Sequence, residues 1–147
     1  LATRRSARCV GCFGCWTRAP GRCVIRDDAT RIYPLIARSD TLLYVSRIRY
    51  GGYDTVMKTM LERAIPVQQA FIRGVDGETH HEQRAVVPKR ATIVAYGAET
   101  PDELELFRQL IARNARNMNF TEHRVLFVRE DEVDDTVKQL IATWERS

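Results

Sequence analysis

The sequence lacks a hydrophobic run long enough to cross a membrane, because stretches such as residues 42–45 end far short of the roughly 18 to 20 residues that a spanning helix needs. No apolar block follows the basic start, so a secretory signal is not expected either. There is no G-x-S-x-G motif, no P-loop and no pair of carboxylates in a setting that suggests acid–base catalysis. These absences favour a cytoplasmic protein with no membrane partner.

The composition excludes a disordered or fibrous chain. Hydrophobic residues make up 44% of the sequence and charged residues 29%, which is close to the average of globular proteins. A chain of 147 residues can bury roughly 70% of its unfolded surface around one core. We therefore expect residues 1–147 to form a single domain. Because residue 1 is Leu rather than Met, we expect the chain to be processed, trimmed or part of something longer.

Positive charge is concentrated at the start of the chain. Residues 1–26 contain no acidic residue and carry a charge of +6, whereas the whole chain carries only +4. The six basic residues are Arg4, Arg5, Arg8, Arg18, Arg22 and Arg26. Such a block can attract the phosphates of a nucleotide or a nucleic acid. A solvated arginine-rich segment is the favoured interpretation, and a nucleic-acid partner is not expected.

Predicted strands and helices alternate from residue 27 onward. Apolar runs rich in β-formers predict strands at residues 41–46, 91–96 and 124–128, the first of them buried on both faces. A helix is expected to begin at Asp27 or Asp28 and to be shortened or kinked by Pro34. Further helices are predicted at residues 54–64, 100–118 and 130–144. This alternation is typical of βαβ units around a parallel sheet, so the predicted class is α/β.

One predicted connection, residues 65–90, is longer than those of compact domains usually are. We expect a long loop that serves as a lid or a partner surface, with Phe71 and Ile72 as apolar anchors. His80, His81 and Arg84 in this loop could bind an anionic substrate, a cofactor edge or a metal. A solvated or interface pair of histidines is favoured over these roles. We expect the three residues near the mouth of a ligand site, reached across a subunit boundary.

Aromatic and glycine residues follow two of the predicted strands, where ligands of open parallel sheets bind. Tyr50, Gly51 and Gly52 come after the first strand, and Tyr96 and Gly97 end the second. Glycine lets the backbone approach a flat ligand closely, and a tyrosine can lie against its ring. Ordinary turn chemistry explains each pair equally well when it is taken alone.

All four cysteines lie within 15 residues, with the spacing Cys9-x2-Cys12-x2-Cys15-x7-Cys23. Structural disulfides are disfavoured in a reducing compartment. Three cysteines at two-residue intervals suit one cubane iron–sulfur cluster, and a fourth thiolate can complete its ligand shell. Zinc fits less well, because structural zinc sites gather two separated pairs of ligands. Unliganded, reduced cysteines remain an equal alternative on spacing alone.

Taken together, these motifs resemble the NADPH-dependent FMN reductase group of flavodoxin-like proteins, and the compact cysteine motif is similar to that of the iron–sulfur flavoproteins. The resemblance is strong over residues 9–64 and loose over residues 91–147. The residues that carry it are the run from Cys9 to Asp28, then Ser39-Asp40, Tyr50-Gly51-Gly52, Lys58 and Glu62-Arg63, with His80-His81-x-x-Arg84 typical of one branch of the group.

The resemblance implies a flavodoxin-like three-layer parallel sheet that is truncated at its N-terminal side. The first strand, the phosphate loop, the helix that follows it and the second strand of the family have no counterpart, so an uncovered sheet edge is expected. FMN would lie between Tyr50, Gly51 and Gly52 on one side and Tyr96 and Gly97 on the other. The family also implies NAD(P)H as electron donor.

Three further expectations complete this interpretation. Cys9, Cys12, Cys15 and Cys23 are candidate ligands of a 4Fe-4S cluster, and the protein is expected to be a homodimer or a higher homo-oligomer. No side chain is expected to act as an acid, base or nucleophile, because the flavin carries the chemistry. The alternative is a non-catalytic binding or assembly module that keeps the sheet and has lost its FMN phosphate site.

Overall fold

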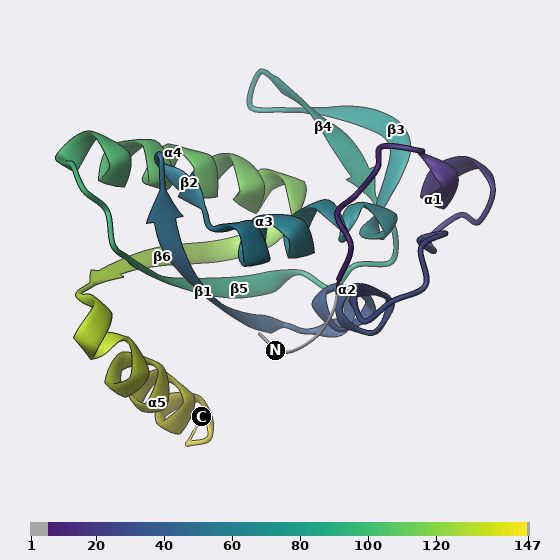
Figure 1. Cartoon of the computed structure of the whole chain (residues 1–147). Helices are drawn as coiled ribbons and strands as arrows, with labels where there is room; N and C mark the ends of the chain where they lie inside the picture. Colours follow the sequence, from purple (N-terminus) through teal and green to yellow (C-terminus); the bar gives the residue numbers. More distant parts are fainter. Residues whose placement is uncertain (1–5, 147) are drawn as a thin grey trace.

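A computed structural model describes residues 6–146, so Arg4 and Arg5 of the basic segment lie outside the described residues. The main sheet has the strand order β2-β1-β5-β6. Its three long strands, β1 (Thr41–Arg49), β5 (Lys89–Tyr96) and β6 (Phe120–Val128), run parallel (Figure 1). The short β2 (Gly52–Tyr53) turns back antiparallel onto the end of β1. The α/β class is confirmed, and the parallel sheet with its helices is consistent with a flavodoxin-like fold.

The helices begin where local sequence signals place them. Thr100 caps α4 (Pro101–Asn117) by accepting a hydrogen bond from the Glu103 amide at 3.3 Å. Asp54 caps α3 (Thr55–Glu62) by accepting one from the Met57 amide at 2.8 Å. The last predicted helix divides into a 3-10 turn, η2 (Glu130–Glu132), and α5 (Val133–Trp144).

The first long helix, α2 (Ala29–Arg38), differs from expectation because it continues through Pro34. Proline cannot donate the backbone bond that a residue inside a helix normally makes. Tyr33 and Ile36 on either side of it are buried in the core. Tertiary packing therefore outweighs the lost hydrogen bond, and the helix is not shortened.

Strand β1 buries one face only, which corrects the prediction of a strand buried on both. Leu42, Tyr44 and Ile48 point into the core beside α4, whereas Val45 on the opposite face is 39% exposed. That opposite side of the sheet carries α5, which contacts β5 and η2 and buries none of its own residues completely (Figure 1). The incomplete cover explains why the outer face of β1 remains open.

The outer edge of β1 is also open. Strand β2 pairs only with Ile48 and Arg49, so residues 41–47 have no strand partner on that side within the described part of the chain. An edge of this kind agrees with what the resemblance implied. No helix among residues 6–146 is long and apolar enough to span a membrane.

The segment 65–90 is not a loop, which corrects the prediction. It contains a 3-10 turn, η1 (Ile65–Val67), and a β-hairpin of β3 (Gln68–Val75) and β4 (Glu78–Gln83). Asp76 and Gly77 connect the strands with φ values of 51° and 79°. Asp-Gly is a preferred pair for such two-residue turns, because both positions need positive φ. The hairpin lies at the opposite end of the molecule from the β1–β2 turn (Figure 1).

Candidate functional site

The predicted flavin-binding residues share one edge of the sheet, which we call the carboxyl edge because β1, β5 and β6 end there. Arg47 of β1 pairs with Tyr96 of β5, so the turns that follow the two strands leave side by side. Tyr50 is 94% exposed and, like Gly51 and Gly97, has a positive φ. The structure therefore brings the two glycine turns to one edge, where a planar ligand could contact both.

The two turns nevertheless line different cavities. Tyr96 and Gly97 line a cavity of about 560 Å³ at the ends of all three parallel strands, together with Pro101, Phe127 and Arg129. Its size falls in the ordinary range for small-molecule sites. Ligands of open parallel sheets bind at this kind of position.

Two arginines that sequence analysis assigned no role lie between the turns. A methyl group added at Gly97 would lie 2.9 Å from Arg47 Nε, so the Arg47 side chain covers this glycine. Arg47 forms an ion pair with Glu130 at 3.5 Å, and Arg49 forms one with Glu99 at 3.8 Å. Arg47 Nε is buried and has no hydrogen-bond acceptor among the described residues. A spare donor beside a glycine turn suits an electron-rich ring edge, and in this structure the Arg47 side chain itself lies over Gly97.

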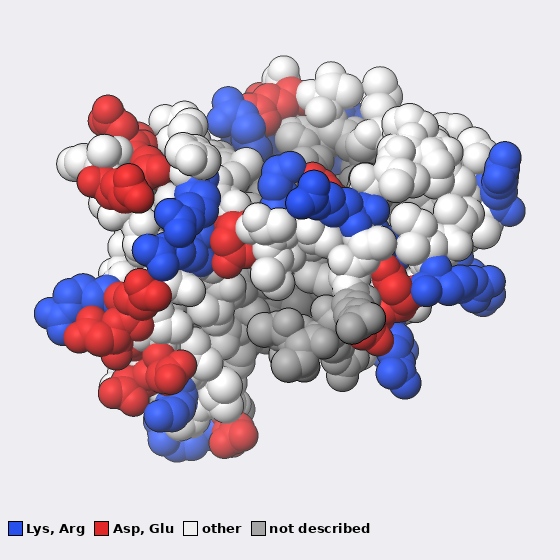
Figure 2. Space-filling view, viewed as in Figure 1, with Lys and Arg blue, Asp and Glu red and all other residues white. Residues whose placement is uncertain are grey.

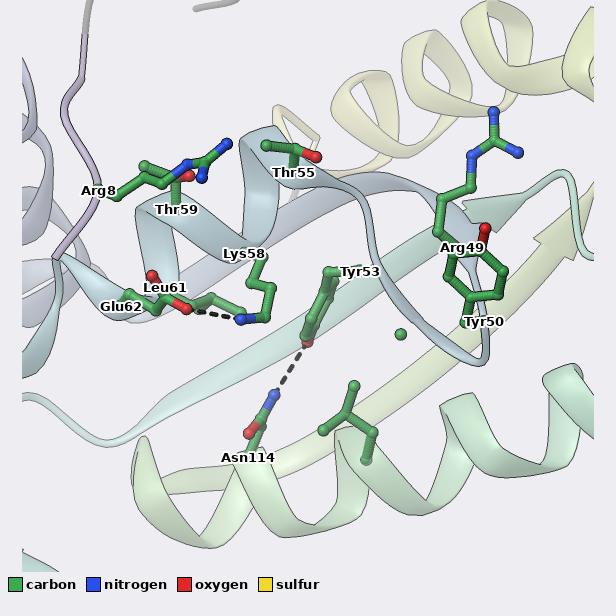
Figure 3. A pocket seen from close by; sticks show the side chains of 12 residues that line it. Arg8, Arg49, Tyr50, Tyr53, Thr55, Lys58, Thr59, Leu61, Glu62 and Asn114 are labelled. Carbon is green, nitrogen blue, oxygen red and sulfur yellow. Dashed lines mark hydrogen bonds and ion pairs between the residues drawn. The ribbon is translucent and has the colours of Figure 1, made fainter.

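Tyr50 and Gly52 line a second cavity, of about 770 Å³, between α3 and α4 (Figure 3). Arg8, Arg49 and Lys58 add positive charge to its wall, and Lys58 is paired with Glu62 at 2.7 Å. On the opposite wall the Asn114 amide donates to the Tyr53 hydroxyl at 3.4 Å. Burial raises the pKa of Tyr53 to about 12, so Tyr53 stays neutral. The cavity is thus cationic on one wall and neutral on the other.

All four cysteines line one small apolar pocket, although they lie partly on a short helix and partly on the turns around it. Its other wall is formed by Val24, Arg63, Ile65 and Pro66. Cys15 lies in the short α1 (Gly14–Thr17), and Cys12 is exposed. Burial raises the pKa of the Cys15 thiol, and negative charge on the other three cysteines raises it further, which reflects how close the four lie.

The cysteine pocket offers ligands of the type and number that an iron–sulfur cluster needs. Among residues 6–146, no three cysteine, histidine or acidic side chains are arranged so that they could hold a metal ion. The thiols thus share one pocket without converging on one point. Gly14 explains the close packing of this loop, because a methyl group there would lie 2.7 Å from Val24.

The hairpin supports the cysteine-bearing helix. The Trp16 indole of α1 donates to the Gln68 carbonyl at 3.1 Å, and its ring lies 4.8 Å from that of His81. His80 is buried between Asn117, at 2.9 Å, and Glu78, at 3.1 Å. These contacts bind β3 and β4 to α1 and to the end of α4.

Within one chain, His80, His81 and Arg84 lie apart from the predicted flavin residues. All three lie at the hairpin end of the molecule, and the predicted flavin residues lie at the carboxyl edge (Figure 1). Arg84 donates to the Pro66 carbonyl at 3.1 Å. A position near the flavin site of a neighbouring subunit stays a prediction.

The Lys and Arg side chains on the face seen in Figure 2 do not form one continuous patch. Lys and Arg side chains on that face are interspersed with acidic and uncharged ones. This distribution suits a solvated segment better than a surface for a long polyanion.

No protein-family model matches the chain. The chain is 32% identical over 66 residues to an iron-sulfur flavoprotein of Archaeoglobus fulgidus, a match covering 45% of this chain and 29% of that protein. It is 28% identical over 71 residues to an iron-sulfur flavoprotein of Methanocaldococcus jannaschii, covering 48% of this chain and 36% of that protein. The matches thus span about a third of the length of these curated relatives. Together with the parallel sheet, they support a relationship between this chain and the flavodoxin-like flavoproteins.

Proposed function

We propose that this chain is part of a flavin-dependent oxidoreductase that passes electrons from NAD(P)H through FMN to an acceptor, with a 4Fe-4S cluster as a second electron carrier. The observation that carries this proposal is that Cys9, Cys12, Cys15 and Cys23 all line one pocket. The similarity to two proteins named iron-sulfur flavoprotein supports it. The identity of the acceptor is left open.

The carboxyl edge is the proposed place of the FMN ring. The turns at Gly51 and Gly97 follow neighbouring strands there, and the buried Arg47 Nε supplies an unused donor. Bound FMN would accept two electrons from the nicotinamide and release them one at a time. The protein's part is to orient the ring and to set its electrostatic surroundings. The positive charge of Arg8, Arg49 and Lys58 in the adjoining cavity would attract the phosphates of FMN or NAD(P)H.

The proposal is tested by an FMN titration followed through flavin fluorescence, with two glycine variants as a matched pair. Gly97→Ala and Gly77→Ala both place a side chain at positive φ, at 72° and 79° respectively. Only Gly97 borders the proposed site, whereas Gly77 is the hairpin turn and has open space around it. We expect the unmodified chain to bind FMN and to quench its fluorescence. Gly97→Ala should weaken FMN binding at least tenfold, and Gly77→Ala should leave the affinity for FMN unchanged.

The same samples test the electron donor. Anaerobic NADPH should bleach the absorbance of the bound flavin in the unmodified chain. A chain that takes up no FMN, or two glycine variants with equal affinity, would contradict the assignment of the flavin to this edge. Failure to bind FMN at all would favour the non-catalytic binding or assembly module.

A further inference from the structure

One guanidinium, that of Arg63, holds both ends of the segment that carries the four cysteines. We call residues 7–27 the cysteine segment. Arg63 Nη1 donates to the Ala7 carbonyl at 2.8 Å and to Asp27 Oδ2 at 2.7 Å. Arg63 Nη2 donates to Asp27 Oδ1 at 2.8 Å and to the Ile25 carbonyl at 3.2 Å. The Ala7 amide also donates to Asp27 Oδ2, at 2.8 Å. The cysteine segment is thus closed into a loop at this single side chain.

The Arg63 side chain is fully buried, with 0% of its surface exposed, and Asp27 is 15% exposed. A buried charge is stable only when it is paired and its hydrogen-bonding groups are satisfied. The bidentate contact with Asp27 meets part of this need. Arg63 Nε, also buried, has no hydrogen-bond acceptor among residues 6–146. Arg63 itself lines the same pocket as the four cysteines.

Arg63 remains a cation in this position. Burial acts to lower its pKa, but the hydrogen bonds that Arg63 donates to Asp27 and the negative charge of that carboxylate hold the pKa above its ordinary value. The backbone of Cys23 is fixed from the other side, because its amide donates to the Tyr33 hydroxyl at 3.2 Å. The positive charge of Arg63 therefore lies in the same pocket as Cys23, the cysteine that is furthest along the chain from the other three.

We propose that Arg63 is a positioning residue for the group that the four cysteines bind, and that its Nε donates a hydrogen bond to a sulfur of that group. This inference rests on the proposed function, in which the group is an iron–sulfur cluster. The bidentate contact closes the cysteine segment over the pocket. The positive charge next to an anionic cluster stabilises its more negative, reduced state and so raises its reduction potential.

The experiment compares the unmodified chain with Arg63→Lys, Arg63→Gln and a control, Lys138→Gln, which alters an exposed cation on α5. Each protein is reconstituted anaerobically with iron and sulfide. The rate of iron loss to a chelator and the midpoint potential are then measured. Amide hydrogen exchange of residues 7–27 is followed in the metal-free proteins.

Arg63→Lys keeps the positive charge but cannot make the bidentate contact with Asp27. We therefore expect at least tenfold faster iron loss and faster amide exchange of the cysteine segment. The midpoint potential should stay close to that of the unmodified chain, because the charge is kept. Arg63→Gln should lose iron equally fast and shift the potential to more negative values. Lys138→Gln should change none of the three readouts. If Arg63→Gln does not fold, Arg63→Lys against Lys138→Gln decides the positioning role.

Unchanged iron loss, exchange and potential in both Arg63 variants would overturn this inference while leaving the cluster in place. If the unmodified chain takes up no cluster, the proposed function fails instead. The exchange measurement on metal-free protein then still decides whether Arg63 closes the cysteine segment, since unchanged exchange in Arg63→Lys would overturn that role as well.

Discussion

At the scale of single residues, the roles of the cysteines and of Arg63 differ in how far the sequence reveals them. The spacing of four cysteines within a short stretch is visible in the sequence and predicts a common ligand site, and in the structure all four line one small pocket. Arg63 lies 40 residues beyond Cys23 in the numbering, and no local pattern marks it as buried. Its contact with Asp27 depends on how α3 packs against the cysteine segment. Long-range contacts of this kind follow from the tertiary fold and not from periodicity.

Asp27 gives a prediction about the dependence of stability on pH. The hydrogen bond from Arg63 holds the pKa of Asp27 below its ordinary value in the folded protein. The stabilisation by this pair is therefore complete above the unfolded pKa of about 3.9 and is lost as the pH falls through the lower, folded pKa. We expect Asp27→Asn to lower the free energy of unfolding of the metal-free protein by about 3 kcal/mol at pH 7, because it leaves Arg63 buried without a counter-charge.

The measurement is urea unfolding of the unmodified chain and of Asp27→Asn across the range from neutral to acidic pH. The difference between the two should be constant down to about pH 5 and should shrink below about pH 4, since the wild-type carboxyl then becomes neutral too. A difference of the same size at neutral pH and at the lowest pH would mean that the charge of Asp27 contributes nothing.

At the scale of helices and strands, the parallel strands and the capped helices follow from the sequence. The cap at Thr100 and the strand of residues 91–96 lie where they were predicted. The hairpin was missed because its strands are polar, as in residues 78–83, and carry no apolar alternation. The Asp76-Gly77 pair was the available signal for a two-residue turn. The α2 helix shows the opposite error, in which a local breaker, Pro34, was given more weight than burial.

The hairpin also carries the prediction about partners. We propose a homodimer that uses the exposed apolar side chains Phe71 and Ile72, which are 70% and 65% exposed on β3. Adjacent exposed apolar residues are typical of a surface that meets a partner. We expect sedimentation at tens of micromolar to give twice the chain mass of 16.9 kDa. The double variant Phe71→Ser, Ile72→Ser should give the mass of one chain.

A matched control for this pair is Val56→Ser, which removes an apolar side chain that is 61% exposed on α3, away from the hairpin. It should leave the mass at that of the dimer. A monomeric unmodified chain, or a dimer that survives the double variant, would show that the hairpin supports only the cysteine segment of its own chain.

At the scale of the whole molecule, the two proposed cofactor sites lie at different ends of the sheet. The glycine turns lie at the carboxyl edge, whereas the cysteine pocket lies beside η1 and the hairpin (Figure 1). The sequence predicted both sets of residues but not this separation, since the direction of α3 carries the chain from one end of the sheet to the other. The open edge of β1 was expected only through the family resemblance, and its open face was not predicted, because the apolar run of residues 41–46 indicated burial on both faces.

The central claim is that one chain holds both a flavin and an iron–sulfur cluster. The most direct test is an anaerobic titration with dithionite of protein reconstituted with FMN, iron and sulfide, followed by visible absorbance and counted per chain. The account predicts about three electrons per chain, two taken up by the flavin and one by the cubane cluster. Uptake of about two electrons by a protein that holds flavin but no iron would contradict the claim. So would uptake of about one electron by a protein that holds iron but no flavin, or no uptake at all.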